Sequence, residues 1–204
     1  VNPFGLASQG GHSAPVLADI DADGEPDVFV GDTNGITSFF LNTGTTSAPN
    51  YVLQNGNLGL VDVGDEASVT LADIDGDGDL DAFMGSLQGT TRYFRNDGNA
   101  ATGSFVEQAS NIGLQDVGAS SRPAFADIDG DGDSDLFVGN SVGEVWFFRN
   151  TGSASAPTFQ MAAQASNNFG MGTVGAMASP TLVDLDGDGD LDAVVGDQDG
   201  EANV

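Results

Sequence analysis

The sequence predicts an all-β fold: a β-propeller built from four-stranded antiparallel blades, with four blades in this chain, the last of them incomplete. Three observations support this. A nine-residue acidic loop occurs four times at nearly constant spacing, and short apolar runs separated by glycine-rich turns follow each loop. No stretch of about 12 residues shows the 3.6-residue period of an amphipathic helix, and the 30 glycines disfavour helices further.

The repeat is visible in two markers that keep step with each other. The first aspartate of the loop recurs at positions 19, 73, 127 and 184, in steps of 54, 54 and 57 residues. A glycine between apolar residues recurs with the same steps, at Gly5, Gly59, Gly113 and Gly170. We therefore expect one repeat domain over residues 1–204, with units of approximately 1–54, 55–108, 109–165 and 166–204.

Each unit is predicted to contain four short strands. The first runs into the acidic loop, as at 15–18, and a continuous apolar run follows the loop, as at 28–30, which is typical of a strand buried on both faces. Two glycines four residues apart then mark a hairpin turn, and a third strand carries paired aromatic residues. The fourth strand is expected to begin near Tyr51, Phe105 and Phe159. Such a unit is a propeller blade, which must stack on its neighbours to bury both faces.

The ends of the chain do not coincide with the ends of blades. Val204 aligns with Phe39, which belongs to the predicted third strand of the unit. The sequence that begins at Val1 shows neither the basic nor the apolar region of a signal peptide. We expect a processed protein or a piece of a longer chain, forming part of a larger propeller or assembly. A homo-oligomer or filament that completes the open ends is the alternative arrangement.

The four loops read Asp-x-Asp-x-Asp-Gly-x-x-Asp, with a further acid at position 7. Like charges about 4 Å apart repel by roughly 1–4 kcal/mol even in wet surroundings, so the loops predict a bound cation. Alternating carboxylates around a turn glycine match the front of an EF-hand loop, and hard oxygen ligands favour Ca²⁺. Position 12, a glutamate in EF-hands, is here Val30, Met84, Val138 or Val195. Position 9 must therefore close the site. For a single loop, the alternative to a metal site is an acidic turn exposed to solvent. The recurrence of the same pattern at equivalent positions of four repeats disfavours that alternative.

Four Ca²⁺ sites are predicted, with carboxylates from positions 1, 3, 5 and 9 and a backbone carbonyl from position 7. In chain order, these candidate metal residues are Asp19, Asp21, Asp23, Glu25 and Asp27; Asp73, Asp75, Asp77, Asp79 and Asp81; Asp127, Asp129, Asp131, Asp133 and Asp135; and Asp184, Asp186, Asp188, Asp190 and Asp192.

Composition narrows the classes of function. The formal net charge is -27, and the loops hold 20 of the 31 acids. Four Ca²⁺ would bring the charge to -19, which still repels nucleic acid and anionic lipid. No apolar run approaches the roughly 20 residues of a membrane-spanning helix. The absence of cysteine excludes disulfides, thiolate zinc sites and cysteine nucleophiles.

No catalytic residue is predicted. The segment 139–143 matches the G-x-S-x-G elbow, but the residues equivalent to Ser141 in other repeats include Thr33 and Leu87, and no helix is predicted after it. His12, the only histidine, has no counterpart in other repeats and is expected at the surface. Trp146 is interpreted as a packing residue, with a sugar platform as the alternative. Arg95 and Arg149 share one repeat position, and we expect both to pair with nearby acids.

These loops, the Phe-Gly markers and tails such as 150–157 resemble the FG-GAP/VCBS repeat family, which includes the integrin α-subunit propeller and many large secreted bacterial proteins. The resemblance covers the whole chain. It implies a β-propeller, typically closed with seven blades, with Ca²⁺ in the loop between the first and second strands of each blade. Repeat one departs slightly, with Ala22 in place of glycine and Pro26 before Asp27, and neither change removes a ligand.

The functional expectation is a non-enzymatic, extracellular calcium-binding repeat module for adhesion, cell-surface structure or protein interaction. Its partner would be a protein or a glycan at the cell surface. Two alternatives stay open. One is a carbohydrate-binding propeller or accessory domain of a secreted polysaccharide-active enzyme, and the other is a self-assembling extracellular filament or sheath subunit.

Overall fold

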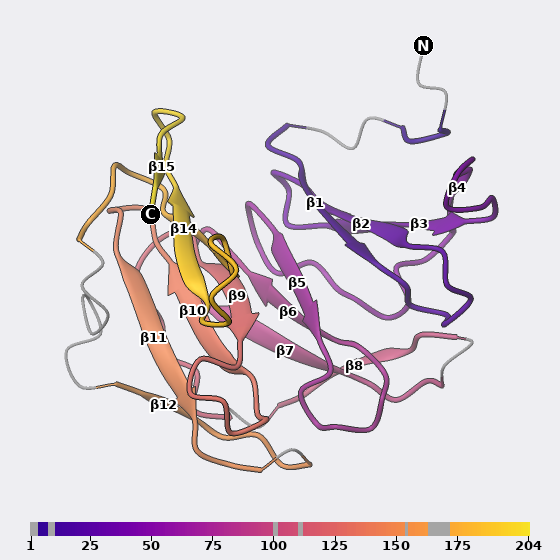
Figure 1. Cartoon of the computed structure of the whole chain (residues 1–204). Coiled ribbons are helices and arrows are strands. Elements are labelled where there is room, and N and C mark those ends of the chain that lie inside the picture. The colour runs from indigo at the N-terminus through magenta and orange to yellow at the C-terminus, as the bar shows by residue number, and fades with distance from the viewer. Residues whose placement is uncertain (1–3, 8–10, 100–101, 110–111, 154, 163–171) are drawn as a thin grey trace.

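The protein is described by a computed structural model that covers residues 4–7, 11–99, 102–109, 112–153, 155–162 and 172–204. Within these ranges, 15 strands form four small antiparallel sheets arranged as a four-bladed β-propeller (Figure 1). The predicted all-β fold is confirmed. Among the described residues there is no helix of the length and apolarity needed to cross a membrane.

Each blade is an antiparallel meander whose strands pair in chain order. The fourth strands begin at Tyr51, Phe105 and Phe159, as predicted. The fourth blade has three strands in this chain. The strands are β1 (Ala14–Ala18), β2 (Asp27–Gly31), β3 (Thr37–Asn42) and β4 (Tyr51–Leu53); β5 (Ser68–Ala72), β6 (Asp81–Gly85), β7 (Thr91–Asn96) and β8 (Phe105–Glu107); β9 (Arg122–Ala126), β10 (Asp135–Gly139), β11 (Val145–Asn150) and β12 (Phe159–Met161); and β13 (Ser179–Val183), β14 (Asp192–Gly196) and β15 (Ala202–Asn203).

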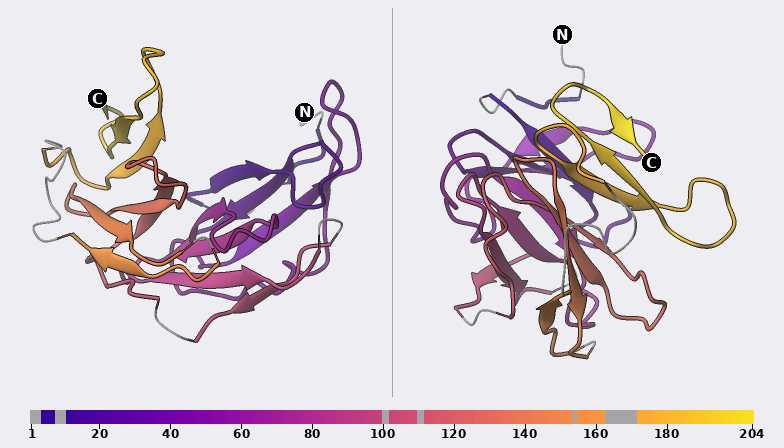
Figure 2. Two further views of the ribbon diagram at one scale, coloured as in Figure 1. Left: turned by 60° about the horizontal axis from the view of Figure 1, so that its bottom comes forward. Right: turned by 90° about the vertical axis from the view of Figure 1, so that its left-hand side faces the viewer.

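The first strands of the blades lie innermost. Strand β1 contacts β5, β5 contacts β9, and β9 contacts β13, so the four first strands follow one another about a common axis. Figure 2 shows the blades following one another in a curved array, with the N-terminal and C-terminal blades at its two ends. The start of every first strand is therefore brought toward the same region of the molecule.

The cores lie between the blades. Three clusters of buried apolar side chains fill the spaces between blades 1 and 2, 2 and 3, and 3 and 4. Strands β2, β6 and β10 are buried along their whole length, as their continuous apolar runs predicted. Each contributes a phenylalanine that contacts an aromatic ring of the next strand, with centroid distances of 4.8 Å for Phe29 and Phe39 and 4.7 Å for Phe83 and Tyr93.

Backbone hydrogen bonds join each blade to the segment that leads into the next one. The amide of Ala67 donates to the carbonyl of Asp32 at 2.9 Å, and the amide of Ser121 donates to the carbonyl of Ser86 at 2.9 Å. This approach needs a glycine at the end of the second strand. A Cβ atom at Gly85 would lie 2.1 Å from the carbonyl oxygen of Ser121.

The apolar-glycine marker that precedes each blade fixes the blade's own fourth strand. The amide of Phe105 donates to the carbonyl of Leu58 at 2.7 Å, and the amide of Phe159 donates to the carbonyl of Ile112 at 2.6 Å. The marker thus ties the beginning of a repeat to its end. The marker of the fourth repeat, at 169–171, lies outside the described residues.

Replacing Gly85 with alanine tests the close approach of neighbouring blades. We expect Gly85→Ala to lower the free energy of unfolding by about 1–3 kcal/mol, because the added methyl group overlaps a backbone oxygen that cannot move freely. Gly196→Ala is the matched control, since a Cβ atom there would meet only the carbonyl oxygen of Ser179, at 3.9 Å. Urea unfolding of both variants measures the difference, and equal destabilisation would contradict this account.

Candidate metal centres

The four acidic loops connect the first and second strands of their blades, as predicted. Each loop turns sharply at its position-6 glycine, where φ is 89° at Gly24, 94° at Gly78, 93° at Gly132 and 98° at Gly189. Left-handed backbone is readily available to glycine and disfavoured for other residues. The glycines therefore bend the loop so that its alternate side chains face one region.

The position-1 aspartate holds the loop in this shape. In the third loop, Asp127 Oδ1 accepts a hydrogen bond from the amide of Gly130 at 2.8 Å, and Asp127 Oδ2 accepts one from the amide of Gly132 at 3.0 Å. Equivalent bonds from the position-6 glycine reach Asp19, Asp73 and Asp184. These hydrogen bonds within the loop hold its shape without the help of an ion.

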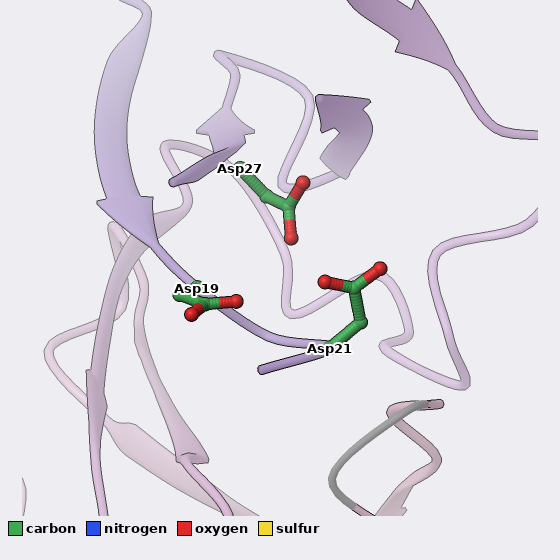
Figure 3. Close-up of side chains that lie close together, drawn as sticks. All are labelled: Asp19, Asp21 and Asp27. Carbon is green, nitrogen blue, oxygen red and sulfur yellow. The ribbon is translucent and has the colours of Figure 1, made fainter. Parts of the chain in front are cut away.

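Carboxylates of every loop converge. In the first loop, the side chains of Asp19, Asp21 and Asp27 turn toward a shared space (Figure 3). Among the described residues, four triads have one carboxylate oxygen each within 4.8 Å of one another: Asp19, Asp21 and Asp27; Asp73, Asp75 and Asp77; Asp127, Asp129 and Asp131; and Asp184, Asp186 and Asp192. Positions 1 and 3 belong to all four triads. The third member is position 9 in the first and fourth loops and position 5 in the second and third loops. The position-7 side chains of Glu25, Asp79, Asp133 and Asp190 belong to none of them.

The position-9 aspartate is the most buried member of its loop in the first three blades. Asp27, Asp81 and Asp135 are no more than 1% exposed. Asp81 Oδ1 accepts a hydrogen bond from the amide of Asn96 at 2.7 Å, and Asp81 Oδ2 accepts one from the hydroxyl of Tyr93 at 3.2 Å. This carboxylate thus joins the end of the loop to the third strand of the blade.

The asparagine that ends the third strand was not predicted to belong to the site. Its amide donates to the position-9 carboxylate at 2.7 Å in each of the first three blades, from Asn42, Asn96 and Asn150. The Asn96 side chain also donates to the carbonyl of Leu80 and accepts from the amides of Gly98 and Ser104. A constant separation of 15 residues from the position-9 aspartate is the signal in the sequence that could have revealed this role.

The loops leave buried carboxylate oxygens without partners. Asp21 Oδ1, Asp75 Oδ1 and Asp135 Oδ2 are buried and accept no hydrogen bond. Burial raises the pKa of Asp27 to about 6, of Asp81 to about 7 and of Asp135 to about 6, although backbone amide donors lower each of them. An unsatisfied buried acceptor destabilises the folded state. A divalent cation would satisfy these oxygens, and an all-oxygen donor set in a flexible loop fits Ca²⁺.

Other residues singled out in the sequence lie away from these triads, with one exception. Arg95 pairs with Asp97 at 2.5 Å, and Arg149 pairs with the loop residue Asp129, as expected. The Trp146 ring packs beside the core between blades 2 and 3, and its Nε1 donates to Glu144 at 3.2 Å, which favours the packing interpretation. Ser141 lies in the turn between β10 and β11, and no helix follows it.

Ala22 occupies a backbone conformation that suits glycine. Its φ is 55°, and the equivalent Gly76 has φ of 72°. We expect Ala22→Gly to raise the free energy of unfolding by about 1 kcal/mol, because a Cβ atom is strained in left-handed backbone. The reverse change Gly76→Ala should lower it by a similar amount. Chemical denaturation at fixed calcium measures both, and a destabilising Ala22→Gly would refute the strain argument.

The buried position-9 carboxylates predict opposite pH responses with and without metal. In metal-free protein their pKa values exceed that of an unfolded aspartate, about 3.9, so the folded state holds more protons between about pH 4 and pH 7. Stability contributed by these groups is therefore present at low pH and is lost as the pH rises through 6–7. In calcium-saturated protein the sign should reverse, since protons compete with the ion. Melting of resin-stripped and calcium-loaded protein from pH 4.5 to 7.5 tests this, and slopes of the same sign would contradict it.

The comparisons with known proteins agree with this arrangement. The FG-GAP-like repeat matches the chain three times, over residues 19–84, 73–138 and 127–195, so that each match runs from one acidic loop through the second strand of the next blade. A search of curated proteins found no match. The three overlapping matches together span residues 19–195, and the chain therefore belongs to the FG-GAP-like repeat family.

Proposed function

We propose that this protein is a non-enzymatic, extracellular calcium-binding module whose propeller serves adhesion, cell-surface structure or protein interaction. The observation that carries the proposal is the set of four carboxylate triads at equivalent places in four blades. Buried oxygens without hydrogen-bond partners in the first three loops add to it. The same oxygen-rich arrangement, built four times, supports a structural ion in each blade.

Each loop's own residues would hold the ion with carboxylates from positions 1, 3, 5 and 9 and the carbonyl of position 7. When bound, Ca²⁺ supplies positive charge that offsets the repulsion between these acids. Position 1 keeps the loop turned through its bonds to backbone amides. Position 9 transmits the loop's geometry to the third strand through Asn42, Asn96 and Asn150. Calcium would therefore stabilise the blade as a whole.

The charge of the chain restricts the partner. With four Ca²⁺ the formal charge of -27 becomes -19, which disfavours polyanionic partners such as nucleic acid and anionic lipid surfaces. A surface protein or a glycan meets this requirement. A carbohydrate-binding propeller or enzyme accessory domain, and a filament subunit that assembles through open blade ends, are the alternatives. Glycan arrays in calcium and electron microscopy of the native material distinguish them.

Calcium removal tests the proposal directly. A ligand that binds only the folded state adds about 2.7 kcal/mol per site at a hundredfold excess over Kd, so four sites rival a whole domain stability of roughly 5–15 kcal/mol. We expect EDTA to lower the melting temperature sharply and Mg²⁺ to restore it poorly, because Mg²⁺ prefers small octahedral sites. Identical melting curves in Ca²⁺, Mg²⁺ and EDTA would refute the proposal.

A loop variant assigns the effect to the proposed sites. Asp75→Asn should remove one Ca²⁺ from the binding stoichiometry measured by calorimetry, because Asp75 belongs to the second triad and has a buried, unpartnered oxygen. Asp65→Asn is the control, since Asp65 is exposed and lies outside the triads. Loss of binding in the control alone would place the ion elsewhere.

A further inference from the structure

A cavity of mixed polar and apolar lining lies at the axis of the propeller, away from the acidic loops. Its volume is about 550 Å³, which is within the usual range of small-molecule sites, roughly 300–1,000 Å³. Every repeat contributes to its lining, which includes His12, Glu66, Arg122, Met177, Ser179, Asp197 and Gln198. Arg122 and Ser179 begin their first strands, and His12 and Glu66 stand just before theirs. The convergence of the first strands therefore builds this cavity.

One lining position is strained in all four repeats. His12, Glu66, Ser120 and Met177 occupy equivalent places, and their φ angles are 50°, 56°, 60° and 65°. Left-handed backbone costs a non-glycine residue about 1–2 kcal/mol, yet this glycine-rich chain keeps a side chain here each time. His12, Glu66 and Met177 line the large cavity, and Ser120 lines a smaller one that shares His12, Glu66 and Arg122. Strained positions that persist point to a function for their side chains.

Arg122 is the unusual residue of the cavity. Arg92, Arg95 and Arg149 each form an ion pair, whereas Arg122 forms none with any described residue. Its Nε is buried and has no hydrogen-bond partner in the described part of the chain. The equivalent residues of other repeats are small, Ala14, Ser68 and Ser179. The guanidinium is thus left with donors to satisfy, and its planar fork matches a carboxylate.

The groups around Arg122 are suited to hydroxyls. Glu66 Oε2 accepts a hydrogen bond from the hydroxyl of Ser120 at 3.3 Å, and His12 Nδ1 lies 3.8 Å from Glu66 Oε1. Here the carboxylate stands between the serine and the histidine, so no base contacts the serine hydroxyl as a nucleophilic triad requires. Glu66 keeps acceptor capacity for a ligand, and Ser179 and Gln198 add polar groups from the fourth blade. The Asp197 carboxylate on the same wall already accepts the backbone amides of Gly175, Asp199 and Glu201.

We propose that this axial cavity binds a small hydroxylated monocarboxylate, such as a single uronic acid. Its carboxylate pairs with the Arg122 guanidinium, and its hydroxyls donate to Glu66 and contact Ser179. Arg122 is the single arginine of a lining that also holds the acids Glu66 and Asp197, so the site can accept one negative charge and disfavours a ligand with several. The ligand is either a free sugar acid or the terminal residue of a glycan. The site is separate from the calcium loops and does not depend on their occupancy for its chemistry.

Calorimetric titration of the calcium-loaded chain tests this proposal, with free glucuronate, an oligosaccharide ending in glucuronate, and glucose as probes. Glucuronate should bind the unmodified protein, and Arg122→Gln should weaken that binding by about tenfold or more through loss of a charge-assisted hydrogen-bond pair. Arg122→Lys, which keeps the charge and loses the fork, should be intermediate. Arg92→Gln is the matched control, because Arg92 pairs with Glu107 and does not line the axial cavity.

The outcomes are decisive in either direction. Tighter binding of the oligosaccharide than of free glucuronate identifies a glycan terminus as the ligand, and the reverse identifies a free sugar acid. Glucuronate binding that is absent, matched by glucose or unchanged in Arg122→Gln overturns the proposal. Calcium-dependent melting of each variant shows whether it is folded, so failure of the axial site is distinguishable from failure of the calcium sites. If Arg122→Gln does not fold, glucuronate binding by Arg122→Lys is compared with that by Arg92→Gln. Weaker binding by Arg122→Lys supports the proposal, and equal binding overturns it.

Discussion

The buried carboxylate at position 9 is the constraint on which each complete blade depends. Asp27, Asp81 and Asp135 lie where the loop, the second strand and the third strand meet, and each accepts the backbone amide of the asparagine that ends the third strand. A charge in such a place destabilises the fold unless it is protonated or neutralised by a cation. The neighbouring aspartates supply further oxygens and repel one another without an ion. The position-9 carboxylate consequently couples the geometry of the loop to that of the blade.

The stacking of the repeats depends on a second constraint, which is the close approach of the backbones of neighbouring blades. In each of the first three blades, the turn after the second strand forms backbone hydrogen bonds with the segment that leads into the next blade. The strand ends in a glycine there, because the neighbouring backbone lies too close for a side chain. Apolar clusters then fill the space between sheets. Because the same contacts recur at each interface, the blades keep a constant relation to the axis. Equivalent residues from different repeats meet there.

The acidic loops and the axial cavity differ in whether equivalent positions of the repeats carry the same residue or different residues. At the loops, every repeat supplies nearly the same acidic residues, and the result is four similar triads. At the axis, equivalent positions carry His12, Glu66, Ser120 and Met177, so the two cavities there are lined by four different side chains. Acids concentrate in the loops, while one arginine without an ion pair among the described residues lies at the axis. A repeat fold can thus give each unit its own candidate metal centre and also form a cavity to which all units contribute.

The sequence by itself determined the blades and the candidate ligands, because both are local. Alternating acids around a glycine define a loop within nine residues, and continuous apolar runs define β2, β6 and β10. Tertiary structure alone decided the partners of position 9, since Asn42, Asn96 and Asn150 lie 15 residues away in sequence and reach it only through strand pairing. It also decided the axial cavity. His12, Glu66 and Arg122 belong to different repeats and carry no motif, and only the stacking of blades around an axis brings them together.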